Sequence, residues 1–170
     1  MIAESDILKA GILIVDDQDA NVRLLEQILA DAGYTHVTFT KQPMDVRTLH
    51  NKNRYDLILL DLQMPVMDGF QVIAGLKADQ LDDYLPVLAI TAQPGHKLRA
   101  LQAGAKDFVS KPFDLTEVKT RIHNIIEVRL LYKKLMRDNH ELERQVKERT
   151  AELRSSEARW RSLTAQSVMP

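Results

Sequence analysis

The sequence of 170 residues contains no cysteine, which excludes disulfide bonds, thiolate nucleophiles and zinc sites built on thiolates. Its five histidines lack the spacing of metal ligands, and we expect ordinary surface or helix positions for His36, His50, His96, His123 and His140. No stretch approaches the roughly 18 consecutive apolar residues of a membrane span. The start, MIAESDILKAG, also lacks the basic-then-apolar order of a signal peptide. These absences predict a cytoplasmic protein without a membrane partner.

Blocks of like charge are missing as well. Up to Ile126, 13 Lys and Arg stand against 17 Asp and Glu, and from Glu127 onward 10 stand against 7. An acidic front and a mildly basic tail indicate two different segments, and the charges of the tail alternate in sign as on a solvated helix face. Direct binding to nucleic acid is therefore not expected. With 45% apolar residues, the chain is long enough for one domain with an appendage.

Short β-rich runs alternate with stretches of helical periodicity in the acidic front. The runs are Ile12–Val15, His36–Phe39, Leu57–Leu60, Val87–Ile90 and Asp107–Val109. Five helices are predicted between and after these runs. The first begins at the cap Asp19 and ends at Gly33, and Pro43, Val46 and Leu49 mark the second. Val72, Ile73 and Leu76 mark the third, Leu98 and Leu101 after Pro94 mark the fourth, and Asp114 with Glu117 forms a capping box that starts the fifth.

This alternation predicts an α/β fold with a five-stranded parallel, doubly wound sheet of the flavodoxin-like kind, covered by helices on both faces. The continuous apolar character of Ile12–Val15 and Leu57–Leu60 agrees, because central parallel strands are buried on both sides. In such sheets ligands bind beyond the carboxyl ends of the strands. The chemistry is therefore expected at that edge.

Polar side chains follow four of the predicted strands, namely Asp16 and Asp17, Asp61, Thr91 and Lys111. Each one alone has an ordinary explanation as a turn, loop, strand-end or surface residue. Together they predict a site, because clustered carboxylates repel one another unless a cation holds them, and an all-oxygen cluster favours Mg²⁺. A carboxylate can also accept a phosphoryl group, whose charge a metal ion and a lysine would neutralise.

The stretches ILIVDDQ, LILLDLQMPVMDG, PVLAITA and AGAKDFVSKPF resemble the response-regulator receiver domain of bacterial two-component signalling, over residues 10 to 126. The resemblance implies a signalling domain, phosphorylated by a histidine kinase or phosphotransfer protein in a phosphorelay, and not an enzyme that turns over a substrate. It implies that Asp61 is the phosphoacceptor and that the Mg²⁺ site comprises Asp61, Asp17 as a direct ligand, Asp16 acting through water, and the backbone carbonyl of Gln63. It also implies that Thr91 and Phe108 form the switch, that Lys111 pairs with the phosphate, and that the peptide before Pro112 is cis.

Two departures from the family pattern concern the fine behaviour of the switch. Phe108 stands where many relatives have tyrosine, so its inward rotation cannot depend on a hydroxyl group. Gln63 and Gln93 occupy positions that tune phosphate lifetime in this family, and the sequence does not convert them into a rate.

The tail contains no Pro or Gly between Phe113 and Met169 and follows a heptad pattern. One predicted core position holds Ile125, Tyr132, Asn139, Val146, Leu153 and Trp160, and the other holds Val128, Leu135, Leu142, Arg149, Ser156 and Leu163. Nine of these twelve are apolar, which predicts that the last helix extends into a long coiled coil and a parallel homodimer, with Asn139 paired to itself. Arg149 and Ser156 weaken the seam. A marginal seam is either structurally loose or sensitive to the state of the receiver.

The expected organisation is a lead over residues 1–9, a receiver over 10–126, a coiled-coil dimerisation and signalling helix over 127–165, and a tail over 166–170. The stretch QVKERTAELRSSEARWRSL resembles connector helices that join receivers to PAS, diguanylate-cyclase, HD-type phosphodiesterase or kinase modules. The chain is then either a piece of a longer regulator or a short protein that ends in its dimerisation helix.

Three functions stay open at this point. The first is a phosphorylation-controlled switch that relays the state of Asp61 through the last helix to a coiled-coil dimer and an output module absent from this chain. The second is an interaction scaffold whose dimerisation does not depend on phosphorylation. The third is a metal-dependent phosphatase with Asp61 as nucleophile, which the absence of an acid or base two residues later, at Gln63, disfavours.

Overall fold

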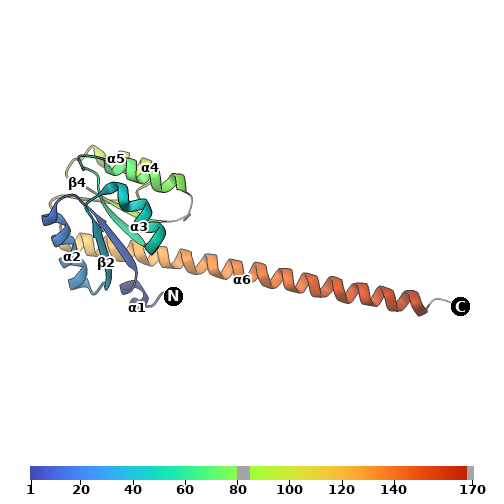
Figure 1. Ribbon diagram of the computed structural model, residues 1–170. Helices are drawn as coiled ribbons and strands as arrows, with labels where there is room; N and C mark the ends of the chain where they lie inside the picture. The colour runs from blue at the N-terminus through green and yellow to red at the C-terminus, as the bar shows by residue number, and fades with distance from the viewer. Residues whose placement is uncertain (80–84, 168–170) are drawn as a thin grey trace. The chain divides into compact units, whose positions relative to one another are not determined.

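The computed structural model describes residues 1–79 and 85–167. It contains one sheet of five strands in the order β2-β1-β3-β4-β5, each parallel to its neighbours (Figure 1). The strands are β1 (Gly11–Val15), β2 (His36–Thr40), β3 (Leu57–Asp61), β4 (Val87–Thr91) and β5 (Asp107–Ser110). The doubly wound, flavodoxin-like sheet predicted from the alternating pattern is confirmed.

Helices connect consecutive strands, as parallel pairing requires. The connecting helices are α2 (Asp19–Ala32), the 3₁₀ turn η1 (Pro43–Asp45) with α3 (Val46–Asn53), α4 (Gly69–Asp79) and α5 (His96–Ala103). Helix α1 (Glu4–Leu8) precedes the first strand, and α6 (Leu115–Ser167) follows the last. No helix in the described ranges is long and apolar enough to cross a membrane.

Alternate residues of the buried strands face two separate hydrophobic clusters. Ile12, Ile14, Leu57 and Leu59 point to one face of the sheet, where apolar side chains of α1, α2 and α6 cover them. Their sequence neighbours point to the other face, which α3, α4 and α5 cover. Both faces are therefore shielded from water, and only the strand ends offer a place for polar chemistry.

Several details differ from the predictions. The lead contains helix α1, whose Ile7 is buried in the core. Asp19 is the first residue of α2 and not its cap, because the helix begins after Gln18, which lies in an extended conformation. His50, expected at an ordinary position, lies on α3 and is buried. Its Nδ1 accepts a hydrogen bond of 3.1 Å from the backbone N–H of Tyr55, which ties the end of α3 to the approach of β3.

The chain divides into two compact units, Met1–Leu131 and Tyr132–Pro170. Within the first unit, Val118, Ile122 and Ile126 of α6 are buried against the sheet. In the second unit the same helix continues to Ser167, and its large apolar side chains are exposed. The predicted long final helix is confirmed.

Candidate phosphoacceptor and metal site

Three carboxylates meet at the carboxyl ends of β1 and β3. Asp61 is the last residue of β3, and Asp16 and Asp17 follow β1 directly. Because Val15 pairs with Leu60 in the neighbouring strand, the next residues of the two strands, Asp16 and Asp61, reach the same edge together. One carboxylate oxygen from each of Asp16, Asp17 and Asp61 lies within 4.8 Å of the others, and both Asp16 and Asp61 are 1% exposed.

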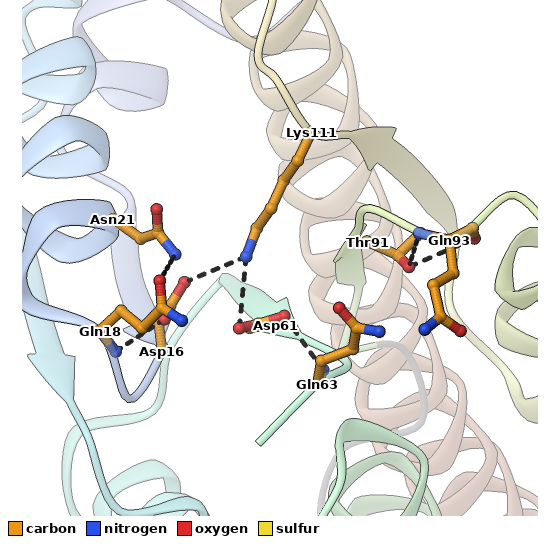
Figure 2. Close-up of polar contacts among 8 residues, drawn as sticks. All are labelled: Asp16, Gln18, Asn21, Asp61, Gln63, Thr91, Gln93 and Lys111. Atoms are coloured by element: carbon orange, nitrogen blue, oxygen red, sulfur yellow. Dashed lines mark hydrogen bonds and ion pairs between the residues drawn. The ribbon is translucent and has the colours of Figure 1, made fainter. Parts of the chain in front are cut away.

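Local hydrogen bonds hold these carboxylates in place (Figure 2). The backbone N–H of Gln18 donates to Asp16 Oδ1 over 2.9 Å, and the N–H of Gln63 donates to Asp61 Oδ1 over 3.0 Å. The side-chain amide of Asn21, in the first turn of α2, donates to Oε1 of Gln18 over 3.2 Å beside Asp16. The role of Asn21 was not predicted from the sequence. Its place in the helical turn after the two acids is the signal that would have indicated it.

Among the residues that the structure describes, Lys111 supplies the positive charge that contacts this cluster. It follows β5, and its backbone N–H donates to the carbonyl of Thr91 over 2.9 Å. Its Nζ lies 3.4 Å from Asp61 Oδ2 and 3.9 Å from Asp16 Oδ2. The peptide bond between Lys111 and Pro112 is cis. Three carboxylates against one ammonium leave two negative charges at the edge of the sheet.

Burial raises the pKa of both Asp16 and Asp61 above the ordinary aspartate value of 3.8. For Asp61, the hydrogen bond from Gln63 and the charge of Lys111 oppose this, and the charge of Asp17 adds to it. For Asp16, the hydrogen bond from Gln18 opposes the shift and the charge of Asp61 adds to it. The fold therefore holds these acids together although burial and mutual repulsion both disfavour their ionised forms.

The donor set fits a divalent hard cation. Among the described residues, Asp16 Oδ2 and Asp17 Oδ1 are buried and accept no hydrogen bond, so two oxygens are left to a ligand. All the side-chain donors are carboxylates, and their excess of two negative charges equals the charge of Mg²⁺. Asp16, Asp17 and Asp61 are the residues here that would hold this ion.

The loop after Asp61 is held close to the acid by a glycine and a helix cap. A Cβ atom on Gly69 would lie 2.7 Å from the Cα of Leu62 and 2.8 Å from the carbonyl oxygen of Asp61, so a side chain does not fit there. Asp68 Oδ1 accepts from the N–H of Gln71, and Gln71 Oε1 accepts from the N–H of Asp68, both over 3.0 Å. This reciprocal cap starts α4 directly beside the phosphoacceptor candidate.

Thr91 and Phe108, the predicted switch residues, lie on neighbouring strands near the site. Thr91 ends β4 and is buried. Its hydroxyl accepts from the N–H of Gln93 over 3.0 Å and points toward that residue (Figure 2). Phe108 lies on β5, and its half-buried ring faces two cations, with Lys97 Nζ 4.9 Å and Arg121 Cζ 5.8 Å from the ring centroid.

The predicted dimerisation residues lie on α6, outside the acidic site, and the structure does not bring them to it. Most of them are exposed large apolar residues, from Val128 at 50% to Leu153 at 70%. Tyr132 is half-buried, and Asn139 is exposed. The exposed stripe comprises Val128, Leu131, Leu135, Leu142, Val146, Leu153, Trp160 and Leu163, and we call it the α6 stripe.

Comparison with known proteins agrees with this geometry. Residues 12–123 match the model of the response regulator receiver domain. The response regulator PleD of Caulobacter vibrioides is 38% identical over 130 residues, which are 75% of this chain and 28% of PleD. The chemotaxis protein CheY-3 of Vibrio cholerae is 30% identical over 118 residues, 68% of this chain and 91% of that protein. The chain thus spans less than a third of the length of PleD.

Solved structures give the same result. The receiver domain of a sensor histidine kinase from Pseudomonas aeruginosa, determined with a magnesium ion coordinated in its active-site cleft, superposes with a TM-score of 0.64 at 30% identity. The match covers 70% of this chain and 98% of that one.

Proposed function

Because this chain belongs to the response regulator receiver family, we propose that it is a phosphorylation-controlled switch whose phosphoacceptor is Asp61, with a histidine kinase or phosphotransfer protein as donor. The observation that carries the proposal is the setting of Asp61. Its buried carboxylate lies within 4.8 Å of two further acids and 3.4 Å from Lys111, at the open edge of the sheet. A structural acid would not need this arrangement, whereas a phosphoryl acceptor does.

The transfer follows from the chemistry of these groups. A carboxylate oxygen of Asp61 attacks the phosphorus of the donor phosphohistidine, a P–O bond forms, and the P–N bond breaks toward the imidazole of the donor. Lys111 Nζ pairs with the oxygens of the arriving phosphoryl group, and Asp16 and Asp17 are the residues that would hold the metal. Bound Mg²⁺ supplies the remaining neutralisation of charge. The backbone carbonyl of Gln63 completes the proposed ligand set.

Phosphorylation of Asp61 then changes the conformations of Thr91 and Phe108. In the present conformation the Thr91 hydroxyl bonds to its own loop through Gln93. A phosphoryl oxygen on Asp61 is a stronger acceptor than the carbonyl of Gln93, so the hydroxyl turns toward it. The space that this frees admits the ring of Phe108, which leaves its contacts with Lys97 and Arg121. Arg121 belongs to α6, so the rearrangement reaches the last helix.

Phosphorylation is tested with a small phosphodonor. Incubation of the protein with acetyl phosphate and Mg²⁺ should add a single phosphate, detected by intact-mass spectrometry. Asp61→Asn should remain unmodified, and so should the wild type in a chelator. Asp31→Asn, at an exposed acid of α2, serves as the matched control and should label like the wild type. Equal labelling of Asp61→Asn would contradict the assignment.

The α6 stripe is the proposed output surface, which forms a parallel homodimeric coiled coil. Eight large apolar side chains exposed along one helix at near-heptad spacing are costly in water and are buried when two copies pair. Leu142→Glu should weaken the dimer in light scattering, and the neighbouring Glu143→Gln should not. A monomeric wild type at all concentrations tested would contradict the dimer.

The same stripe also favours a second candidate, a scaffold whose dimerisation ignores phosphorylation, because none of the residues of the stripe belongs to the acidic site. Light scattering with and without beryllofluoride, which mimics the phosphoryl group, separates the two. A switch changes the monomer–dimer equilibrium, and a scaffold does not. The whole protein's output is not specified by the receiver, since PleD extends far beyond the matched residues.

A further inference from the structure

A second buried aspartate lies at the other end of β3. Asp56 directly precedes the strand and is 8% exposed. Its Oδ2 accepts from the N–H of Gly11 over 3.1 Å, and its own N–H donates to the carbonyl of Gly11 over 2.7 Å. These bonds fasten the start of β3 to the start of β1. Asp56 and Asp61 are five residue steps apart along the strand, a distance on the order of 16 Å.

The cation that meets Asp56 comes from α6. Arg129 is 3% exposed, and its Nε lies 3.7 Å from Asp56 Oδ1. On the same helix, Ile122 and Ile126 are fully buried against the sheet, one and two turns before Arg129. The inward face of α6 thus carries a buried charge at Arg129 where its preceding turns use isoleucine, and Leu130 beside it packs against the same core.

This choice of residue is informative because a buried ion pair is a poor way to gain stability. Taking both charges out of water costs about as much as their attraction returns, and an apolar pair of similar volume is often equally stable. A charge pair differs from an apolar contact in being directional. An isoleucine can slide over neighbouring apolar atoms, but a guanidinium that leaves its carboxylate loses its counter-charge inside the protein.

The α6 stripe begins beside this pair. Val128 and Leu131, immediately around Arg129, are 50% and 43% exposed. Successive residues of a helix are about 100° apart, so the direction in which Arg129 points fixes the directions of Val128 and Leu131. In this one turn, α6 changes from a helix packed on the receiver to a helix that presents apolar residues to solvent.

We propose that Asp56 and Arg129 are positioning residues, which fix the rotation of α6 about its own axis within the first unit and so set the directions of Val128 and Leu131, the first residues of the α6 stripe. The inference deepens the proposed function, since the stripe is the output surface there. The pair acts at the amino end of the sheet, so it holds the helix without touching Asp61, Thr91 or Lys111. A movement that begins at the phosphorylated edge of the sheet therefore reaches the stripe through a helix that the Asp56–Arg129 pair holds in place.

The test measures the setting of α6 in the unphosphorylated protein, so it does not depend on phosphotransfer. The chain has no cysteine, which allows two spin labels to be placed cleanly at Gln27→Cys on α2 and Leu131→Cys on α6, both exposed positions of the first unit. The distance distribution is measured by pulsed electron paramagnetic resonance in an excess of unlabelled protein. The wild-type pair should give one narrow distribution.

Arg129→Met should broaden or shift this distribution, and amide hydrogen exchange of α6 around residue 129 should accelerate about tenfold. Arg137→Met, which removes an exposed arginine of the same helix, is the matched control and should change neither measurement. In Asp56→Asn with Arg129→Met, no buried charge is left alone, so the double variant should fold well and still show the broad distribution.

An unchanged distribution in both variants would overturn the proposal and leave the phosphorylation of Asp61 untouched. Loss of folding in both the single and the double variant would also overturn it, because the pair would then serve general stability. Conversely, failure of Asp61 to accept phosphate would remove the proposed function, while these distances would still report whether the pair sets the helix.

Discussion

Strand β3 carries a buried aspartate at each end, and the two differ in what surrounds them. Asp56 at the amino end meets the N–H of Gly11 and the guanidinium of Arg129. Asp61 at the carboxyl end meets the N–H of Gln63 and Lys111, but also two other acids. Around Asp56, one negative charge faces one positive charge. Around Asp61, three negative charges lie together and one positive charge balances only one of them.

The difference teaches that burial alone does not tell a structural acid from a reactive one. Both side chains are almost fully removed from solvent. Around Asp56, the neighbouring elements bring donors and a counter-charge, which makes the ionised acid part of the fold. Around Asp61, they bring like charge and two oxygens without hydrogen bonds among the described residues, which makes the site dependent on an added cation. The contrast predicts opposite responses to substitution.

The largest effect is expected at the amino end. Asp56→Ala removes the counter-charge from the buried guanidinium of Arg129 and the acceptor from the N–H of Gly11, and it should lower the free energy of unfolding by about 3–5 kcal/mol. Urea titration followed by circular dichroism measures this. Asp45→Ala, at an exposed acid before α3, is the control and should cost far less. If the two substitutions lower the free energy of unfolding equally, Asp56 is not an acid that stabilises the fold.

A divalent cation should act at the carboxyl end only. Mg²⁺ at ten times its dissociation constant should raise the free energy of unfolding of the wild type by about 1.4 kcal/mol, since it binds the folded acids and not the unfolded chain. Asp17→Asn should lose most of this gain. A gain that survives in Asp17→Asn would place the cation elsewhere.

Removing the acid at the carboxyl end should stabilise the protein when metal is absent. Because burial raises the folded pKa of Asp61 above 3.8, the folded form binds this proton more tightly than the unfolded form does, and stability falls as pH rises through that range. At pH 7 the ionised acid is therefore a net cost, and Asp61→Asn should gain on the order of 1 kcal/mol in a chelator. The gain should vanish near pH 3, where the wild-type carboxyl is protonated too. A destabilised Asp61→Asn at pH 7 would contradict the comparison.

The two aspartates also differ in how well the sequence predicts them. Asp61 is found from a local signal, an apolar run that ends in a polar residue, and the same signal gives Asp16 after β1 and Thr91 at the end of β4. Asp56 carries no such signal, because its partner Arg129 comes from a helix far along the chain and no periodicity links them. Tertiary contacts decide such pairs, and a single sequence does not contain them.

Helix α1 and the buried face of α5 could not be predicted from the sequence, for a related reason. Helix α1 has five residues and rests chiefly on Ile7, too few to show a period. In α5, Leu98 and Leu101 mark the helix in the sequence, yet they are 65% and 41% exposed, and the fully buried residue is Ala100. A small side chain lets this helix lie close to the sheet, which hydrophobicity alone does not reveal.

The smallest effect is expected at an exposed contact between α6 and α1. His123 of α6 bonds to Glu4 of α1 over 3.1 Å, and the two side chains are 37% and 65% exposed. The hydrogen bond and charge of Glu4 raise the pKa of His123 above 6.5. This contact therefore stabilises the fold fully below pH 6.5 and is lost as pH rises through the folded pKa.

Nuclear magnetic resonance titration of the His123 ring should give a pKa above 6.5 in the wild type and a value closer to 6.5 in Glu4→Gln. Glu127→Gln, whose acid contributes less to the shift, should move it less. Because water screens this pair, its loss should leave the spin-label distance between α2 and α6 unchanged, whereas Arg129→Met should not. If Glu4→Gln disturbed that distance as much as Arg129→Met, exposed and buried ties would hold α6 equally, and burial of the Asp56–Arg129 pair would have no special role in setting the helix.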